Sequence, residues 1–148
     1  MTYGIDTDFL VALEVSDHPA HRPANNLLDG LLAANHDFAL APQVLAEFIH
    51  VVTDARRVPL PLTVEAAVAR AEFWWCAREV RRIFPNAPAV ETFFSWLKTY
   101  RLGRKRLLDT LLAASLDSAG VTLLITNNQV DYTVFQKFQL IGYTGGAL

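Results

Sequence analysis

Cysteine is almost absent from this chain, which has 148 residues and a single cysteine, Cys76. One cysteine excludes an internal disulfide framework and is typical of proteins from the reducing cytosol. We therefore expect a cytoplasmic protein. Cys76 directly follows Phe73-Trp74-Trp75, and in such apolar surroundings a buried role as a small hydrophobic residue is favoured over a role as a nucleophile.

Long apolar segments are also missing. No stretch approaches the roughly 20 apolar residues that are needed to cross a bilayer. The first residues, Met1 to Asp6, contain neither the basic start nor the long apolar segment of a signal peptide. The sequence therefore predicts no membrane association.

Neither sign of charge is in clear excess. The chain has 13 Lys and Arg against 15 Asp and Glu, for a net charge of −2. A protein this close to neutral is not a general binder of polyanions, so any nucleic-acid site would be a local basic patch. The length predicts one domain over residues 1–148, which is large enough to bury roughly two-thirds of its unfolded surface.

Short apolar segments alternate with helical patterns, which is typical of α/β proteins with a parallel sheet covered by helices. The segment Val121–Ile125 is the clearest strand, because it is β-branched and apolar on both faces. Ligands of such sheets bind beyond the carboxyl ends of the strands, where Asp6 and Thr126 are expected. Thr7 or Asp8 is expected to cap the first helix. Strands are predicted near residues 3–6, 37–42, 79–84, 121–125 and 138–143, helices near 9–13, 20–34, 43–54, 63–77, 90–100 and 107–119, and a helical turn at 131–135.

Four acidic residues stand at the edges of apolar segments, namely Asp6, Glu47, Asp109 and Asp131. A carboxylate among core residues is costly unless its charge is compensated. If the fold brings these residues together, a divalent metal ion is the natural compensator. Simpler roles stay open, because Asp6 can be a turn residue and Asp109 an ordinary helix cap. Glu47 is harder to explain in this way, because apolar neighbours leave little room for a solvated face.

Four short motifs follow one another along the chain. They are Ile5-Asp6-Thr7-Asp8, Glu47-Phe48 on a helix that follows Pro42, Asp109-Thr110-Leu111-Leu112-Ala113-Ala114, and Thr126-Asn127-Asn128-Gln129-Val130-Asp131-Tyr132. In this order they resemble PIN-domain ribonucleases, and most of all the VapC-type toxins of bacterial toxin–antitoxin pairs. The resemblance implies a three-layer α/β/α PIN-like fold, with a short parallel sheet flanked by helices.

The same resemblance implies a catalytic site. Asp6, Glu47 and Asp109 would surround Mg²⁺ or Mn²⁺, and Asp131 would join them as a fourth catalytic acid. Asn128 is neutral where many relatives place an acid, and Asp8 replaces the usual small polar residue. Whether one ion or two are bound therefore stays open.

The implied activity is metal-dependent hydrolysis of RNA phosphodiester bonds by the toxin of a toxin–antitoxin system. The implied partners are an RNA substrate such as tRNA, a cognate antitoxin and a second copy of the chain in a homodimer. Two alternatives stay open: a PIN-like module that binds RNA or protein without cutting, and a nuclease of the same kind that acts on DNA.

A basic segment precedes Asp109, with Lys98 and Arg101 followed by Arg104, Lys105 and Arg106. We expect the last three to contact RNA phosphates, although Lys98 and Arg101 can simply stabilise a helix end.

Other polar residues complete the predicted substrate site. They are Thr7, Thr126 and Asn128, and Thr126 can instead hold Asp6. Arg56 and Arg57 either extend the basic patch or pair with an acidic partner segment. The four histidines lack the spacing of metal ligands, so surface or turn roles are favoured for them.

Overall fold

The structure, a computed structural model, describes residues 1–144. The predicted order of elements is confirmed, and the predicted turn near residue 131 is the short helix α7. The elements are β1 (Thr2–Ile5), α1 (Thr7–Glu14), α2 (His21–Ala33), β2 (Asp37–Leu40), α3 (Pro42–Val52), α4 (Val64–Cys76), β3 (Val80–Arg82), α5 (Ala87–Thr99), the 3₁₀ turn η1 (Arg104–Arg106), α6 (Leu107–Ser118), β4 (Leu123–Ile125), α7 (Val130–Thr133) and β5 (Gln139–Ile141).

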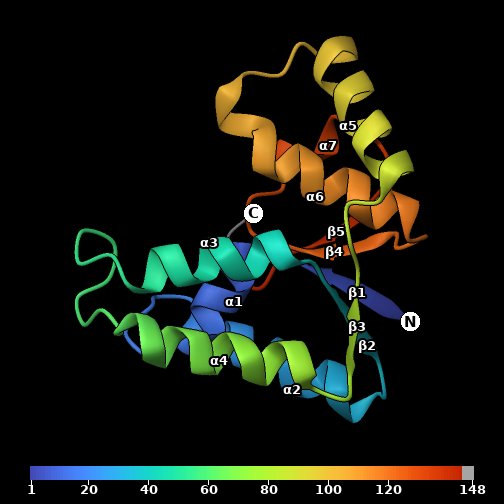
Figure 1. Cartoon of the computed structure of the whole chain (residues 1–148). Helices are drawn as coiled ribbons and strands as arrows, with labels where there is room; N and C mark the ends of the chain where they lie inside the picture. Colours follow the sequence, from blue (N-terminus) through green and yellow to red (C-terminus); the bar gives the residue numbers. More distant parts are fainter. Residues whose placement is uncertain (145–148) are drawn as a thin grey trace.

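The five strands form one parallel sheet in the order β3-β2-β1-β4-β5. Helices α1 to α4 lie on one side of this sheet, and α5, α6 and α7 lie on the other (Figure 1). Contacts link α1 to α2 and α3, and α5 runs along α6. This arrangement confirms the predicted α/β/α fold with a short parallel sheet between helices.

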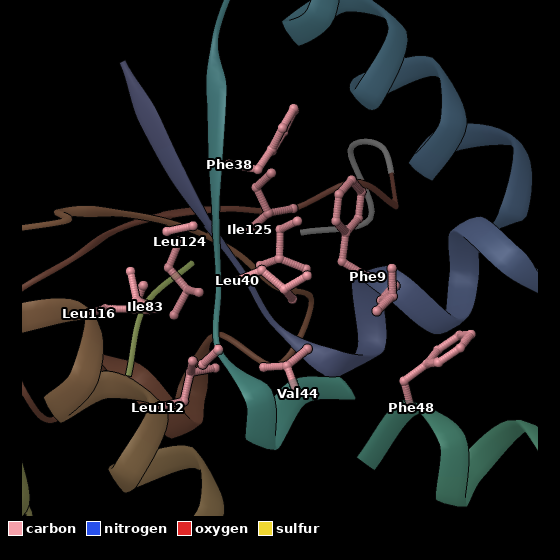
Figure 2. Packing of buried hydrophobic residues seen from close by; sticks show 14 of the residues in the cluster. Phe9, Phe38, Leu40, Val44, Phe48, Ile83, Leu112, Leu116, Leu124 and Ile125 are labelled. Atoms are coloured by element: carbon pink, nitrogen blue, oxygen red, sulfur yellow. The ribbon is translucent and has the colours of Figure 1, made fainter. Parts of the chain in front are cut away.

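The core gathers side chains from the central strands and from both helical layers. Ile5, Leu40 and Ile125, from β1, β2 and β4, are fully buried. Figure 2 shows Phe9 of α1 and Leu116 of α6 among the side chains that surround these strands. Burial on both faces explains why β4 is apolar at every position and why β2 is apolar after Asp37.

Gly4 allows α6 to lie close to β1. A Cβ atom at Gly4 would stand 2.8 Å from Cδ2 of Leu116 and 3.2 Å from the carbonyl oxygen of Leu123. Only glycine fits this gap without a shift of its neighbours. The close contact holds the helix that carries Asp109 against β1, the strand that directly precedes Asp6.

The register of β1 and β4 sets the position of the polar residues beyond them. Ile5 is paired with Ile125, and the backbone N–H of Asp6 donates to the carbonyl oxygen of Ile125 at 3.2 Å. Asp6 and Thr126 therefore leave the sheet side by side at its carboxyl edge.

Three local predictions are wrong. Asp6, and not Thr7 or Asp8, caps α1, because its side chain accepts a hydrogen bond from the backbone N–H of Thr7. Cys76 is exposed rather than buried, and it is the last residue of α4. The helix expected from residue 90 begins at Ala87, since Asn86 caps it by accepting from the N–H of Ala89 at 3.0 Å.

Within residues 1–144, none of the helices has the length and apolar character that crossing a membrane requires.

Candidate active site

Asp6 is fixed by two hydrogen bonds in a buried position. Its Oδ1 accepts from the backbone N–H of Thr7 at 2.8 Å, and its Oδ2 accepts from the hydroxyl of Thr126 at 2.8 Å. The first bond exists because Asp6 caps α1, and the second because β1 and β4 are neighbours. Each carboxylate oxygen keeps a lone pair that can face a cation.

Asp8 adds a second carboxylate within one turn of α1. Its Oδ2 accepts from the backbone N–H of Asn127 at 3.0 Å and lies 3.4 Å from the Thr126 hydroxyl. That hydroxyl has one hydrogen and lies closer to Asp6, so it does not serve both acids well. Oδ1 of Asp8 is buried without a hydrogen-bond partner in the described residues. The hydrogen-bond donors around Asp6 and Asp8 therefore do not offset the negative charge of the two carboxylates.

Asp109 and Glu47 reach the same place from two other helices. Asp109 lies in the first turn of α6, and the Tyr132 hydroxyl donates to its Oδ1 at 3.2 Å. The helix begins at Leu107, with Arg106 at the cap position, so Asp109 is not the helix cap. Glu47 lies on α3, which contacts α6.

These acids line one cavity of about 240 Å³. Its position beyond the carboxyl ends of β1 and β4 is the usual ligand site of parallel sheets. The fold thus brings together three acids that are widely separated in sequence, Asp6, Glu47 and Asp109. Thr7, Asp8 and Asn128 lie beside them. The lining residues are Asp6, Thr7, Asp8, Val11, His18, Glu47, Val51, Arg57, Asp109 and Asn128.

The clustered charge makes these acids hard to ionise. Burial, and then the charge of Asp8, raise the pKa of Asp6 to about 7. Burial raises the pKa of Asp8 to about 6, and burial followed by the charge of Asp6 raises the pKa of Asp109 to about 6. Burial and the charge of Asp109 raise the pKa of Glu47. At neutral pH the cavity therefore favours a bound cation.

The donor atoms of this cavity fit a hard divalent ion. The ionisable groups that face it are mainly carboxylates, and Mg²⁺ takes only one or two of these directly while it keeps several waters. Within residues 1–144, no three acidic, histidine or cysteine side chains form a ready set of ligands. The residues that would hold the ion, directly or through water, are Asp6, Glu47 and Asp109, with Asp8 next to them.

Asp131 does not line the cavity. Nε of Arg106 lies 3.5 Å from Oδ1 of Asp131, and the same guanidinium donates to the Asp131 carbonyl oxygen. The side-chain amide of Asn128 donates to Oδ2 of Asp131. Asp131 therefore orients Arg106 and Asn128, and the structure gives it a supporting position beside the site.

The predicted basic patch is divided by this ion pair. Arg104 and Lys105 are exposed on η1, where they are available to a partner. Arg106 is half-buried and engaged by Asp131, so it is less available to a phosphate.

The structure also places His18 and Arg57 in the cavity. A surface or turn role was expected for His18, and Arg57 was expected either to extend the basic patch or to pair with a partner segment. His18 lies in the turn between α1 and α2, and its Nδ1 accepts from the backbone N–H of Ala20 at 3.0 Å. Burial, and then the charge of His21, lower the pKa of His18. No motif marks either residue, and only the basic composition of the loop after α3 hints at Arg57.

Comparisons with known proteins agree with the nuclease-like site that the geometry indicates. No protein-family profile matches the chain. The chain is 32% identical over 133 residues to Ribonuclease VapC24 of Mycobacterium tuberculosis, which covers 88% of this chain and 89% of that protein.

Two solved structures share the fold. One is VapBC2 from Rickettsia felis, bound to a DNA fragment from its promoter, with a TM-score of 0.68 and 22% identity over 97% of this chain and 99% of that one. The other is VapC20 of Mycobacterium tuberculosis, a toxin that cleaves the sarcin-ricin loop, with a TM-score of 0.64 and 22% identity over 84% and 87% of the two chains. The identity to VapC24 over nearly the whole length, with the four motifs in order, shows that the chain belongs to the VapC family of PIN-domain ribonucleases.

Proposed function

We propose that this protein is a metal-dependent endoribonuclease that hydrolyses RNA phosphodiester bonds and acts as the toxin of a toxin–antitoxin pair. The observation that carries the proposal is the single cavity lined by Asp6, Glu47 and Asp109. The identity to Ribonuclease VapC24 supports RNA as the substrate, and tRNA is the first RNA to test.

The protein's own residues have separable roles in this proposal. Asp6, Glu47 and Asp109 hold the cation, which when bound offsets charge on the phosphate and makes a water more acidic. Thr126 fixes the carboxylate of Asp6, and Tyr132 fixes that of Asp109. Such outer hydrogen bonds set the direction in which the acids face.

Mg²⁺ and Mn²⁺ are the cations that we propose, because both are accepted by sites made of carboxylate oxygens and water. The close pair Asp6 and Asp8, with Glu47 and Asp109 across the cavity, provides enough charge for one ion. A second ion would have to bring ligands from the RNA, since Asn128 is neutral and Asp131 is engaged by Arg106.

A cognate antitoxin and a second copy of the chain are the proposed protein partners. The relative from Rickettsia felis is a VapBC assembly, which supports an antitoxin here. Exposed apolar side chains on α5 and α6 support contacts with another chain, because an isolated surface seldom leaves large apolar groups together. They include Phe94, Leu107 and Leu108, which are 54%, 41% and 49% exposed.

A second candidate is a module that binds RNA or protein without cutting. It is favoured by the neutral side chain of Asn128 in the cavity and by the position of Asp131 outside it. Cleavage of RNA that depends on Mn²⁺ would eliminate this candidate.

Replacement of Asp6 tests the proposal directly. We expect Asp6→Asn to abolish cleavage of tRNA in Mg²⁺ or Mn²⁺, because the amide keeps the shape of the carboxylate but not its charge. Circular dichroism should show an unchanged fold. Asp37→Asn is the control, since Asp37 is exposed at the start of β2, away from the cavity.

The same assay separates the alternatives. RNA and DNA of matching sequence, incubated side by side, distinguish a ribonuclease from a deoxyribonuclease. Full activity of the Asp6→Asn protein would contradict the assignment of Asp6, and a lack of any cleavage by the unaltered protein would favour the binding module.

A further inference from the structure

Arg57 is a cation in an otherwise acidic cavity. It follows α3 in a tight turn, in which its backbone N–H donates to the carbonyl oxygen of Asp54 at 2.9 Å. The next residue, Val58, is only 6% exposed and anchors this turn in the core. The turn therefore holds Arg57 at the rim of the cavity that Glu47 and Asp109 line.

The guanidinium of Arg57 is also available to bind a ligand. Within residues 1–144 it forms no ion pair and no side-chain hydrogen bond, whereas Arg56 pairs with Asp54 at 3.2 Å and Arg106 pairs with Asp131 at 3.5 Å. Its charge acts across the cavity, because it lowers the pKa of Glu47 against the larger effects of burial and Asp109. Of the cavity's lining residues, Arg57 alone is an arginine or lysine.

Arg57 also borders a second hollow. This hollow, of about 370 Å³, is lined by His50, Asp54, Arg56 and Arg57. Arg57 therefore stands between the acidic cavity and an adjoining surface depression. An RNA strand is longer than the acidic cavity. The part of the strand on one side of the cleaved bond therefore has to leave the cavity past a residue at its border, as Arg57 is.

We propose that Arg57 binds the RNA phosphate next to the scissile one, and that the strand passes over it from the acidic cavity into the hollow beside His50. This inference rests on the proposed ribonuclease function. The physical reason is charge: the acids repel an RNA backbone, and a planar guanidinium can bind a phosphate through two parallel N–H groups. Phosphate contacts of this kind position the strand without reading its sequence.

The test is the salt dependence of RNA binding. Asp6→Asn, which does not cleave in this account, serves as the parent protein, and its affinity for a short fluorescent RNA is measured by anisotropy at several salt concentrations. Adding Arg57→Ala should weaken binding and reduce the slope of log Kd against log salt by about 0.7 to 1, the change expected for one lost phosphate contact. Arg57→Lys should keep most of the slope, because the positive charge remains.

Arg78→Ala is the matched control. Arg78 is an exposed arginine that pairs with Glu79 just before β3, at the amino end of the strands, opposite to the cavity. Its removal changes the net charge by the same amount, so it should leave the slope unchanged. In the protein with Asp6 intact, Arg57→Ala should raise KM more than it lowers kcat.

The results separate this inference from the function on which it rests. An unchanged salt slope for Arg57→Ala, in a protein that melts like its parent, would overturn the role of Arg57 even if the unaltered protein cleaves RNA. The same conclusion follows if Arg57→Ala leaves RNA binding intact and instead weakens binding of an acidic peptide. Absence of cleavage by the unaltered protein would contradict the proposed function, whatever the slope.

Discussion

At the scale of single residues, Thr126 links the Asp6 carboxylate to the turn that carries Asn128. Its hydroxyl donates to Asp6 at 2.8 Å and accepts from the backbone N–H of Asn128 at 2.9 Å. Since it is fully buried, water cannot replace either bond. The orientation of Asp6 and the turn that carries Asn128 therefore both depend on this one oxygen.

We expect Thr126→Val to reduce RNA cleavage by about 10- to 100-fold, because valine keeps the shape of threonine but cannot hold the Asp6 carboxylate. Initial rates of tRNA cleavage at saturating Mg²⁺ measure the effect. Thr122→Val is the control, since Thr122 is exposed four positions earlier in the chain. Equal rates for Thr126→Val and the unaltered protein would show that Asp6 does not need this hydroxyl.

Part of the site could be read from the sequence because it depends on local patterns. Asp6 and Thr126 each follow an apolar strand, and a parallel sheet brings such residues to one edge. Glu47 and Asp109 stand out as acids among apolar residues, and the family motifs assign both to the same site. The cavity positions of His18 and Arg57, and the pairing of Arg106 with Asp131, depend on where side chains meet across the fold, and no local pattern reveals that.

At the scale of elements, the contact between β1 and α6 sets the distance between two of the acids. Gly4 is the residue on which that contact depends, because a Cβ atom there would meet Leu116 and the backbone of Leu123. The sequence hints at a close approach, since glycine is unusual inside a strand. The identity of the opposing helix is not readable from the chain, because Leu116 is distant from Gly4 in sequence.

We expect Gly4→Ala to lower the free energy of unfolding by about 1–3 kcal/mol, the usual cost of overpacking a core. Urea unfolding followed by circular dichroism measures this change. Gly30→Ala is the control, because a Cβ atom at Gly30 meets nothing within 4 Å, and alanine favours the helix by up to about 1 kcal/mol. If both variants have the stability of the unaltered protein, the close approach of α6 to β1 is not as described.

Helix ends show where sequence patterns lose accuracy. The start of α5 was expected at residue 90 from the apolar pattern, but Asn86 caps the helix and Pro88 lies in its first turn. Asn86 and Pro88 fall between the strand predicted near residues 79–84 and the predicted helix, and both residue types are common at helix starts.

At the scale of the whole molecule, the clustered acids oppose folding when they are charged. The pKa of Asp6 rises from 3.8 to about 7, and those of Asp8 and Asp109 rise from 3.8 to about 6. At pH values between the ordinary pKa of 3.8 and these raised values, the folded protein binds more protons than the unfolded chain does. Its stability therefore falls as the pH increases. A divalent cation that binds only the folded, ionised site opposes this loss.

We therefore expect the melting temperature in the presence of a chelator to fall between about pH 5 and about pH 7.5, and excess Mg²⁺ or Mn²⁺ to raise it again at the higher pH. The cation effect should be smaller at about pH 5, where more of these acids are protonated. Differential scanning fluorimetry, with NaCl of equal ionic strength as the control, measures both effects. The Asp6→Asn protein should have a flatter profile, whereas a melting temperature unaffected by pH and by divalent ions would show that the acids do not repel one another.

The fold as a whole was the most predictable feature, because the order of strands and helices and the apolar character of the central strands already indicate a parallel sheet. The prediction that residues 1–148 form one domain stays a prediction, and its last four residues lie outside the part of the chain that the structure describes.

The central claim is that Asp6, Glu47 and Asp109 form one cation site. A crystal soaked in Mn²⁺ and measured at the manganese absorption edge tests it most directly. We expect an anomalous peak in the cavity, within coordination distance of at least one or two of these carboxylates. A well-ordered crystal in which the three side chains face separate surfaces, or in which saturating Mn²⁺ binds only elsewhere, would contradict the account.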